Sequence, residues 1–163
     1  MRDIVRIASN APWEPVAGYS RAVRAGDYIF VSGTTATDEN GSVVGIGQMY
    51  LQARQALLNI RNALERMGVG MDHVVRTRMF VTDMSAFADI ARAHGEVFRD
   101  SRPASTLVKV GALVHPDMLI EIEADAYAGP SAGAQRPMKA SARKPARPAP
   151  GKKTAGAKKR RRR

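Results

Sequence analysis

The sequence predicts an α+β domain in which two helices pack on one face of a β-sheet. Segments with β-type alternation outnumber segments with helical spacing, and only two segments are periodic enough to be long helices. Strands and helices alternate only in part: three or four strands, a helix, a strand, a helix and two strands. Because a domain of about 129 residues buries only part of its surface, the second face of the sheet must be polar or covered by another subunit.

The N-terminal third is predicted to consist of strands and turns. Residues 3–8 and 19–25 alternate like half-exposed strands, and the proline-containing segment between them reads as a loop that carries the only Trp. Residues 28–32 form a strong apolar strand. The dipeptide Asn40-Gly41 indicates a hairpin turn followed by a short strand.

Two helices and three strands complete the predicted domain. Residues 48–67 carry apolar side chains at helical spacing, and Gly68 ends this helix. Ser85 is the predicted N-cap of a second helix over about 86–98. The remaining predicted strands are 75–81, 104–111 and 119–127.

The positive charge is concentrated at the C-terminal end of the sequence. Residues 130–163 hold 13 of the 26 Lys and Arg and none of the 15 acids, so the formal net charge of +11 belongs to this segment. It has no Val, Ile, Leu, Phe, Tyr or Trp, and therefore cannot bury enough surface to offset its chain entropy. We predict a domain of residues 1–129 followed by a disordered basic tail of residues 130–163.

The basic tail predicts a non-specific contact with nucleic acid or another polyanion. No aromatic residue interleaves the cations, so base stacking and sequence reading are not expected. An extension that only aids solubility is an almost equal alternative. The residues expected to make the contact are Lys158, Lys159, Arg160, Arg161, Arg162 and Arg163.

Several classes of protein are disfavoured by composition. The absence of Cys excludes disulfides and thiolate metal sites, and no stretch approaches the ~18 apolar residues of a membrane span. Three scattered histidines predict no metal site, and no nucleophile elbow, P-loop or dinucleotide fingerprint occurs. We expect a cytoplasmic protein with no metal site.

The segment LIEIEADA, residues 119–126, is an unusual strand. Period-two alternation places Glu121, Glu123 and Asp125 on one face, and three acids in a row cannot line a dry core. Two interpretations stay open: a solvated sheet face, or a cleft in which one acid shuttles protons or orients water. Lys109 on the neighbouring strand is expected to neutralise part of this charge.

Three other places carry candidate polar or backbone contacts. His94 lies on the apolar stripe of the second helix, where a structural role is the more frequent one. Ser32 and Gly33 end a strong strand, where Gly lets a ligand approach the backbone, although a bulge or bend is slightly favoured. Ser105 and Thr106 begin a strand at a point where side chains can face a cleft.

Six stretches of the chain carry a family resemblance: GYSRAVRAGDYIFVSGT, QARQALLNIRNALERMG, DHVVRTRMFVTDM, FADIARAHGEVF, RPASTLVKV and LIEIEADA. In this order, over about residues 15–128, they resemble the RidA/YjgF family of reactive-intermediate deaminases. The resemblance implies a chorismate-mutase-like fold and a homotrimer with three clefts between subunits, which supplies cover for the second sheet face. Deaminating members hydrolyse enamines or imines such as 2-aminoacrylate to 2-keto acids and ammonia, without a cofactor.

The resemblance also implies a set of site residues. In deaminating members an Arg clamps the substrate carboxylate, and the first Glu of IEIEA holds the attacking water. The Arg position is Ser105 in this sequence, and the position of a helical Asn is Ala91. The positions that match the family are Tyr19, Ser32, Gly33 and Glu121.

The exchange at position 105 weakens the expectation of deamination. A Ser hydroxyl donates one neutral hydrogen bond, whereas the positively charged guanidinium of Arg donates two hydrogen bonds to a carboxylate. These motifs are similar to an Arg-less branch of the family, and Arg102 is a less favoured substitute for the missing Arg. Two functions stay open. One is a hydrolase in which Glu121 orients water, Ser105 and Thr106 hold the substrate, and His94 or Glu96 assists. The other is a non-catalytic metabolite-binding or chaperone-like trimer.

Overall fold

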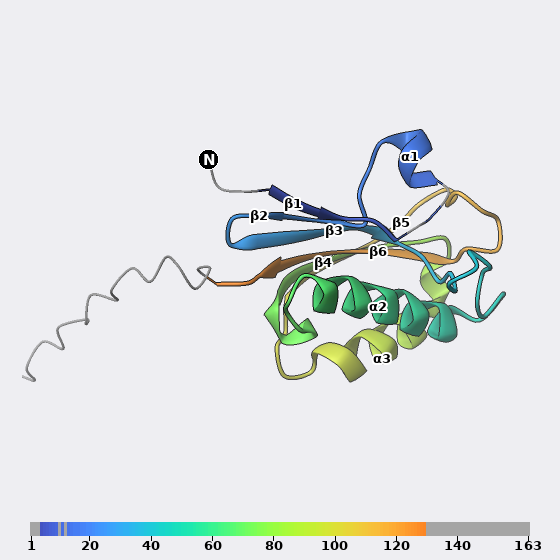
Figure 1. Ribbon diagram of the computed structural model, residues 1–163. Helices are drawn as coiled ribbons and strands as arrows, with labels where there is room; N and C mark the ends of the chain where they lie inside the picture. The colour runs from blue at the N-terminus through green and yellow to red at the C-terminus, as the bar shows by residue number, and fades with distance from the viewer. Residues whose placement is uncertain (1–3, 10, 12, 130–163) are drawn as a thin grey trace, which may run out of the picture.

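The computed structural model describes residues 4–9, 11 and 13–129 of the 163-residue chain. One six-stranded sheet forms a layer, and two long helices lie side by side on one of its faces (Figure 1). The predicted α+β class with two helices on one face is confirmed. The predicted tail, residues 130–163, lies outside the described residues. None of the helices in the described part is long and apolar enough to cross a membrane.

The sheet has the strand order β1-β2-β3-β6-β4-β5. All neighbouring strands are antiparallel except β4 and β5, which are parallel and are connected through a helical crossover. The strands are β1 (Ile4–Ile7), β2 (Ala22–Ala25), β3 (Tyr28–Thr34), β4 (Val74–Val81), β5 (Ala104–Lys109) and β6 (Ile120–Tyr127).

Helices α2 (Met49–Arg66) and α3 (Phe87–Phe98) bury their apolar sides against the sheet. Fully buried side chains from both layers meet there, including Ile60, Leu64, Ile90 and Ile122. Helix α2 ends as predicted at Gly68, whose φ of +82° favours glycine. Two short 3₁₀ helices, η1 (Met71–His73) and η2 (Met84–Ala86), precede β4 and α3.

Three local predictions are wrong. The segment predicted as a loop before residue 19 contains a short helix, α1 (Trp13–Ala17). The turn at Gly41 is followed by an isolated bridge between Thr37 and Val43 rather than by a strand. Ser85 does not cap α3, because it lies within η2 and its amide donates to the side chain of Asp83 at 2.9 Å.

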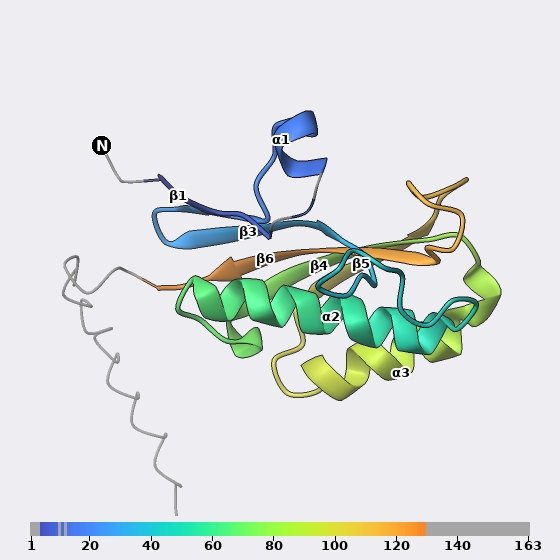
Figure 2. The same cartoon turned by 45° about the vertical axis from the view of Figure 1, so that its right-hand side comes forward.

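The second face of the sheet carries neither α2 nor α3, and we call it the open face. Figure 2 shows the two long helices below the sheet and the short α1 above it. Three aromatic side chains form an exposed cluster on the open face: the ring centroids of Tyr28 and Phe30 lie 6.4 Å apart, and those of Tyr28 and Tyr127 lie 5.3 Å apart. Within the described residues, the part of the open face that bears this cluster is therefore left uncovered.

Candidate functional site

The residues predicted to form one site lie on opposite faces of the sheet. On β6, Glu121, Glu123 and Asp125 point to the open face, and the apolar residues between them are buried against the helices. Ser105 pairs in register with Thr77 of β4, which is fully buried on the helix-covered face. A single chain therefore does not bring Ser105 and Glu121 to the same face.

Gly33 and Glu121 meet on the open face. The pairing of β3 with β6 shifts register between Val31 and Thr34, which confirms the predicted bulge. A Cβ atom at Gly33 would collide with the Oε1 atom of Glu121. The carboxyl can lie against the backbone of β3 only because residue 33 has no side chain.

Arg21 supports this irregular part of β3. Its Nη1 donates to the carbonyl of Gly33 at 2.8 Å and to the hydroxyl of Thr34 at 2.9 Å. Its Nε lies 4.0 Å from a carboxyl oxygen of Glu14, a buried residue of α1 that accepts three hydrogen bonds from Ser9. The segment before β2 is thus anchored to the strand that carries Gly33.

Two further predicted residues belong to the same region. The hydroxyl of Ser32 donates to the carbonyl of Ser20 at 2.7 Å. Tyr19 is half-buried, and the guanidinium carbon of Arg21 lies 5.9 Å from the centre of its ring. We refer to these matching positions as the open-face group: Tyr19, Ser32, Gly33 and Glu121.

The environment of Glu121 favours a carboxyl that holds its proton. Partial burial raises the pKa of Glu121, and the neighbouring charge of Glu123 raises it further. The charge of Arg21 acts in the opposite direction and is the smaller effect. A carboxyl with a raised pKa holds a proton more readily than an ordinary carboxyl and can return it, as a proton shuttle must.

The other two acids of β6 are paired within the chain. Arg78 of β4 lies 3.1 Å from Asp125 and 3.3 Å from Glu123, and the contact with Asp125 is the main cause that raises the pKa of Arg78. The expectation that Lys109 neutralises this row is wrong, because β4 lies between β5 and β6. Among the described residues, Glu121 is the member of the row without an ion pair.

A second cluster, which we call the edge group, lies where β4, β5 and α3 meet: Ser105, Thr77 and His94. The Oγ1 atom of Thr77 lies 3.0 Å from Oγ of Ser105 and 3.0 Å from Nε2 of His94. The imidazole of His94 packs on Phe98 with ring centroids 4.6 Å apart, and burial lowers the pKa of His94. Ser105 itself is exposed at the edge of the sheet.

The remaining predicted positions are separate from both groups. Thr106 pairs in register with Arg78 and points to the open face, so the hydroxyls of Ser105 and Thr106 diverge. Arg102 has a φ of +46°, and its Nε donates to the carbonyl of Arg99 at 3.0 Å. Ala91 is exposed on α3.

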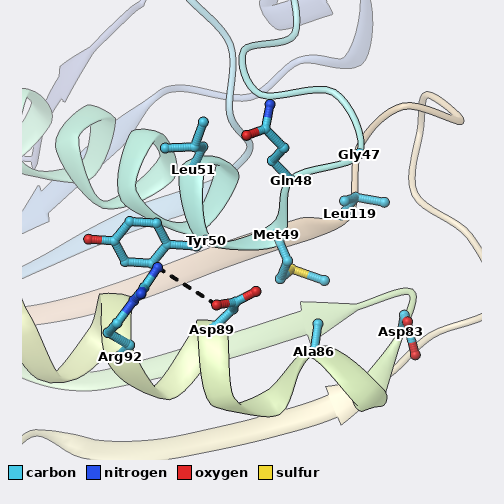
Figure 3. Close-up of a pocket in the computed structure, with 10 residues that line it drawn as sticks. All are labelled: Gly47, Gln48, Met49, Tyr50, Leu51, Asp83, Ala86, Asp89, Arg92 and Leu119. Atoms are coloured by element: carbon cyan, nitrogen blue, oxygen red, sulfur yellow. Dashed lines mark ion pairs between the residues drawn. The ribbon is translucent and has the colours of Figure 1, made fainter.

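A pocket of about 610 Å³ lies between the first turns of α2 and α3 (Figure 3). Arg92 stacks over the ring of Tyr50 at 3.6 Å and lies 3.7 Å from Asp89. None of the predicted site residues lines it, so the family resemblance gives it no role. Its lining residues are Gly47, Gln48, Met49, Tyr50, Leu51, Asp83, Ala86, Asp89, Arg92 and Leu119.

Sequence reasoning missed two residues that organise these groups. Thr77 is the only uncharged polar residue in the strand VVRTRMFV, and a lone hydroxyl at an inward position is a usable signal. Arg21 has no such signal, since its hydrogen bonds to β3 depend on the sheet pairing. Both residues act on backbone or hydroxyl groups of predicted site positions.

Comparison with known proteins covers most of the described domain. The family model described as Endoribonuclease L-PSP matches residues 8–128. The RutC family protein PH0854 of Pyrococcus horikoshii is 35% identical over 127 residues, which are 78% of this chain and 98% of that protein. The 3-aminoacrylate deaminase RutC of Acinetobacter baylyi is 36% identical over 113 residues, 69% of this chain and 89% of that protein.

Solved structures agree with this result. Rv2704 of Mycobacterium tuberculosis, a member of the YjgF/YER057c/UK114 family, has a TM-score of 0.70 and 38% identity, covering 77% of this chain and 99% of that one. The YjgF gene product of E. coli has a TM-score of 0.66 and 31% identity, covering 76% and 97%. The chain therefore belongs to the Endoribonuclease L-PSP family, which is the RidA/YjgF family that its motifs resemble.

Proposed function

We propose that the chain forms a homotrimer in the cytoplasm and hydrolyses a small enamine-like or imine-like metabolite in clefts between its subunits. This proposal rests mainly on the carboxyl of Glu121, which is half-buried, lies against the backbone at Gly33 and has a raised pKa. Membership of the family and a relative named 3-aminoacrylate deaminase support the type of reaction.

The separation of the two groups supports a cleft between subunits. Ser105 and Glu121 occupy family site positions, yet they lie on opposite faces of one chain. A second copy that covers the exposed aromatic residues of the open face would bring its own edge strand to Glu121. One chain then supplies the open-face group, and its neighbour supplies Ser105.

Glu121 is the residue that moves protons in the proposed reaction. An enamine first gains a proton on carbon and loses one from nitrogen, which converts it to its imine tautomer. The oxygen of a water then bonds to the imine carbon, the water proton passes to Glu121, and the C=N electron pair moves to nitrogen, which receives that proton. Glu121 carries the remaining hydroxyl proton to nitrogen, the C–N bond breaks, and ammonia and a carbonyl compound are released.

The edge group defines the class of substrate that we propose. Ser105, Thr77 and His94 supply no permanent positive charge, and an anion buried without a cation is strongly disfavoured. A small substrate with an uncharged carbonyl or amide group therefore fits this side better than a 2-imino acid. We propose on this basis that the chain belongs to the Arg-less branch of the family.

Substitution of Glu121 tests the proposal. A panel of enamines, 2-keto acids and amides is screened for ammonia release and for thermal stabilisation of the protein. Glu121→Gln is expected to lower turnover of any substrate found by ~10²–10⁴-fold, the usual contribution of a general acid–base group. Glu123→Gln is the matched control, because Glu123 lies on the same face of β6 but pairs with Arg78. Equal turnover by wild type and Glu121→Gln would remove Glu121 from the mechanism.

A non-catalytic binding or chaperone-like trimer is the second candidate. The specific observation that favours it is Ser105, which cannot clamp a carboxylate as an Arg does. The same panel distinguishes the two functions, because a binder is stabilised by a ligand without forming product. Stabilisation without ammonia release across the panel would establish the binder and contradict the hydrolase.

We also propose that residues 130–163 form a separate basic tail that contacts nucleic acid or another polyanion. The support is the charge pattern alone, since these residues lie outside the described part of the chain. Retention on DNA should fall steeply as salt rises from low to physiological concentration. Deletion of residues 130–163 should abolish retention at low salt, and persistent binding by the truncated protein would place the contact on the domain.

A further inference from the structure

Thr77 forms the centre of a continuous line of polar atoms from α3 to the edge of the sheet. Its Oγ1 atom lies 3.0 Å from Nε2 of His94 and 3.0 Å from Oγ of Ser105. Thr77 is fully buried, whereas Ser105 is exposed. Whatever contacts Ser105 is therefore connected to His94 through one hydroxyl group that has no access to water.

A hydroxyl group contains one hydrogen, so a relay that runs through Thr77 has a direction. In such a relay Thr77 donates to one of its two neighbours and accepts from the other. In the outward direction, Nε2–H of His94 donates to Thr77, Thr77 donates to Ser105, and the hydrogen of Ser105 is free to reach a ligand. In the inward direction, Ser105 donates to Thr77 and offers a ligand only its lone pairs.

The chemistry of the imidazole favours the outward direction. This direction is compatible with both charge states of the ring, because a protonated ring and one neutral tautomer both carry hydrogen on Nε2. The inward direction is compatible with one neutral tautomer only.

The charged groups on the surrounding elements are engaged elsewhere. On α2 and α3, Arg54 pairs with Glu96 at 3.0 Å. On β4, Arg78 is bound to the acids of the open face, and on β5, Lys109 acts on Asp83. The ring of His94 thus responds mainly to burial, which lowers its pKa and keeps it neutral near pH 7.

We propose that His94, acting through Thr77, holds Ser105 as a hydrogen-bond donor toward an acceptor oxygen of the bound small molecule. This inference rests on the proposed small-molecule cleft and specifies the group that the cleft recognises: a carbonyl or amide oxygen. His94 and Thr77 are positioning residues, since neither reaches the ligand. Chains of hydrogen bonds that point the same way strengthen one another, which partly compensates for the missing charged clamp.

The tautomer of His94 tests the direction of the relay without any ligand. The ¹⁵N shifts of the imidazole nitrogens are measured by NMR above the pKa of His94, with His94→Gln identifying its signals among the three histidines of the chain. Hydrogen on Nε2 is expected in the wild type, and this preference should weaken in Thr77→Val. A wild-type ring with hydrogen on Nδ1 and a bare Nε2 would overturn the inference.

Ligand binding tests the role of the relay in recognition, with pyruvamide and pyruvate as neutral and anionic probes. Thr77→Val and His94→Phe should each weaken pyruvamide binding about fivefold, the size expected for one neutral hydrogen bond. Thr77→Ser and His94→Gln keep a hydroxyl and an N–H donor, and should stay within about twofold of wild type. If Thr77→Val does not fold, the two His94 variants make the same comparison.

The pH dependence of binding distinguishes the two directions again. In the outward direction, wild-type affinity for pyruvamide is retained as the pH falls through the pKa of His94, because Nε2 keeps its hydrogen. A loss of affinity on acidification that is absent in His94→Gln would overturn the inference. If the wild type binds neither probe while its NMR signals show hydrogen on Nε2, the proposed cleft ligand is wrong and the hydrogen-bond direction stands.

Discussion

The two faces of the sheet differ in how complete they are within one chain. On the helix-covered face the large apolar side chains are fully buried, and the buried polar residues Gln52 and Thr77 find all their partners in the same chain. On the open face Tyr28, Phe30 and Tyr127 remain 49%, 45% and 41% exposed beside a row of acids. Folding completes the first face, and we infer that association completes the second.

This difference explains why the predicted site is divided. The open-face group and the edge group are each ordered by contacts within the chain, through Arg21 in one case and Thr77 in the other. Within a single chain, however, the two groups lie on opposite faces of the sheet and do not meet. The division therefore points to a site that depends on assembly rather than on a change of conformation.

A charge on the open face should prevent assembly. Phe30→Lys places an ammonium group opposite Asp125, its partner on β6, so the folded chain tolerates it while a covering subunit would have to bury it. We expect light scattering to show a shift from a trimer to a monomer of 17.6 kDa. Leu58→Lys on α2 is the matched control, since Leu58 is 42% exposed, and it should leave the assembly intact. If both variants dissociate, or if neither does, the open face has no special role in assembly and the prediction is wrong.

Loss of a buried amide should destabilise the helix-covered face. Gln52 is fully buried, donates to the carbonyls of Gly45 and Asp117, and accepts from the amide of Leu119. Gln52→Leu leaves these backbone groups unpaired and should lower the free energy of unfolding by roughly 2–4 kcal/mol, measured by denaturant titration. Gln55→Leu, at a half-buried position of the same helix, should lower it by less; an equal loss would contradict the importance of this internal pairing.

Displacement of Glu121 should affect the site more than the fold. Gly33→Ala introduces a methyl group where Oε1 of Glu121 now lies, and the flexible end of that side chain can shift to make room. We expect turnover, or ligand affinity if the protein is a binder, to fall by roughly 10–100-fold, because small misplacements of a catalytic group are costly. Gly111→Ala, where a Cβ meets nothing within 4 Å, is the control. An unchanged activity in Gly33→Ala would separate Gly33 from the site.

The raised pKa of Glu121 should appear in the pH dependence of stability. The folded chain binds this proton more tightly than the unfolded chain, so stability falls as the pH rises from the ordinary carboxyl pKa through the raised one. Glu121→Gln removes this dependence and should be the more stable protein at neutral pH, by less than ~1 kcal/mol because the group is half exposed. Parallel stability curves for the two proteins would contradict the raised pKa.

The helices and strands were predictable wherever apolar residues recur at a regular spacing in the sequence. The apolar spacing of α2 and the alternation of β6 gave the correct elements and the correct buried faces, and the spacing of α3 gave the correct element. Local hydrogen bonds decided the failures. The Pro15 segment forms α1, and the side chain of Asp83 rather than that of Ser85 makes the capping contact. Periodicity does not report such contacts.

The candidate site residues are predictions from the sequence, and their arrangement could not be predicted from it. Gly33 and Glu121 matched family positions, and the structure brings them together. The contact of Ser105 with Thr77 joins residues 28 positions apart and depends on the parallel pairing of β4 with β5. Strand order, which composition and alternation do not determine, also explains why Lys109 is remote from the acids of β6.

Cross-linking between subunits tests the division of the site most directly. The chain has no Cys, so Ser105→Cys and Glu121→Cys each introduce a single thiol. The two variants are co-expressed and treated with a short bismaleimide, and the linked residues are identified by mass spectrometry. We predict covalent dimers joined between residue 105 of one chain and residue 121 of another, and none with this linkage when either variant is treated alone. Failure of residues 105 and 121 to link in the mixed assembly, while both thiols react with a monofunctional maleimide, would contradict a site shared between chains.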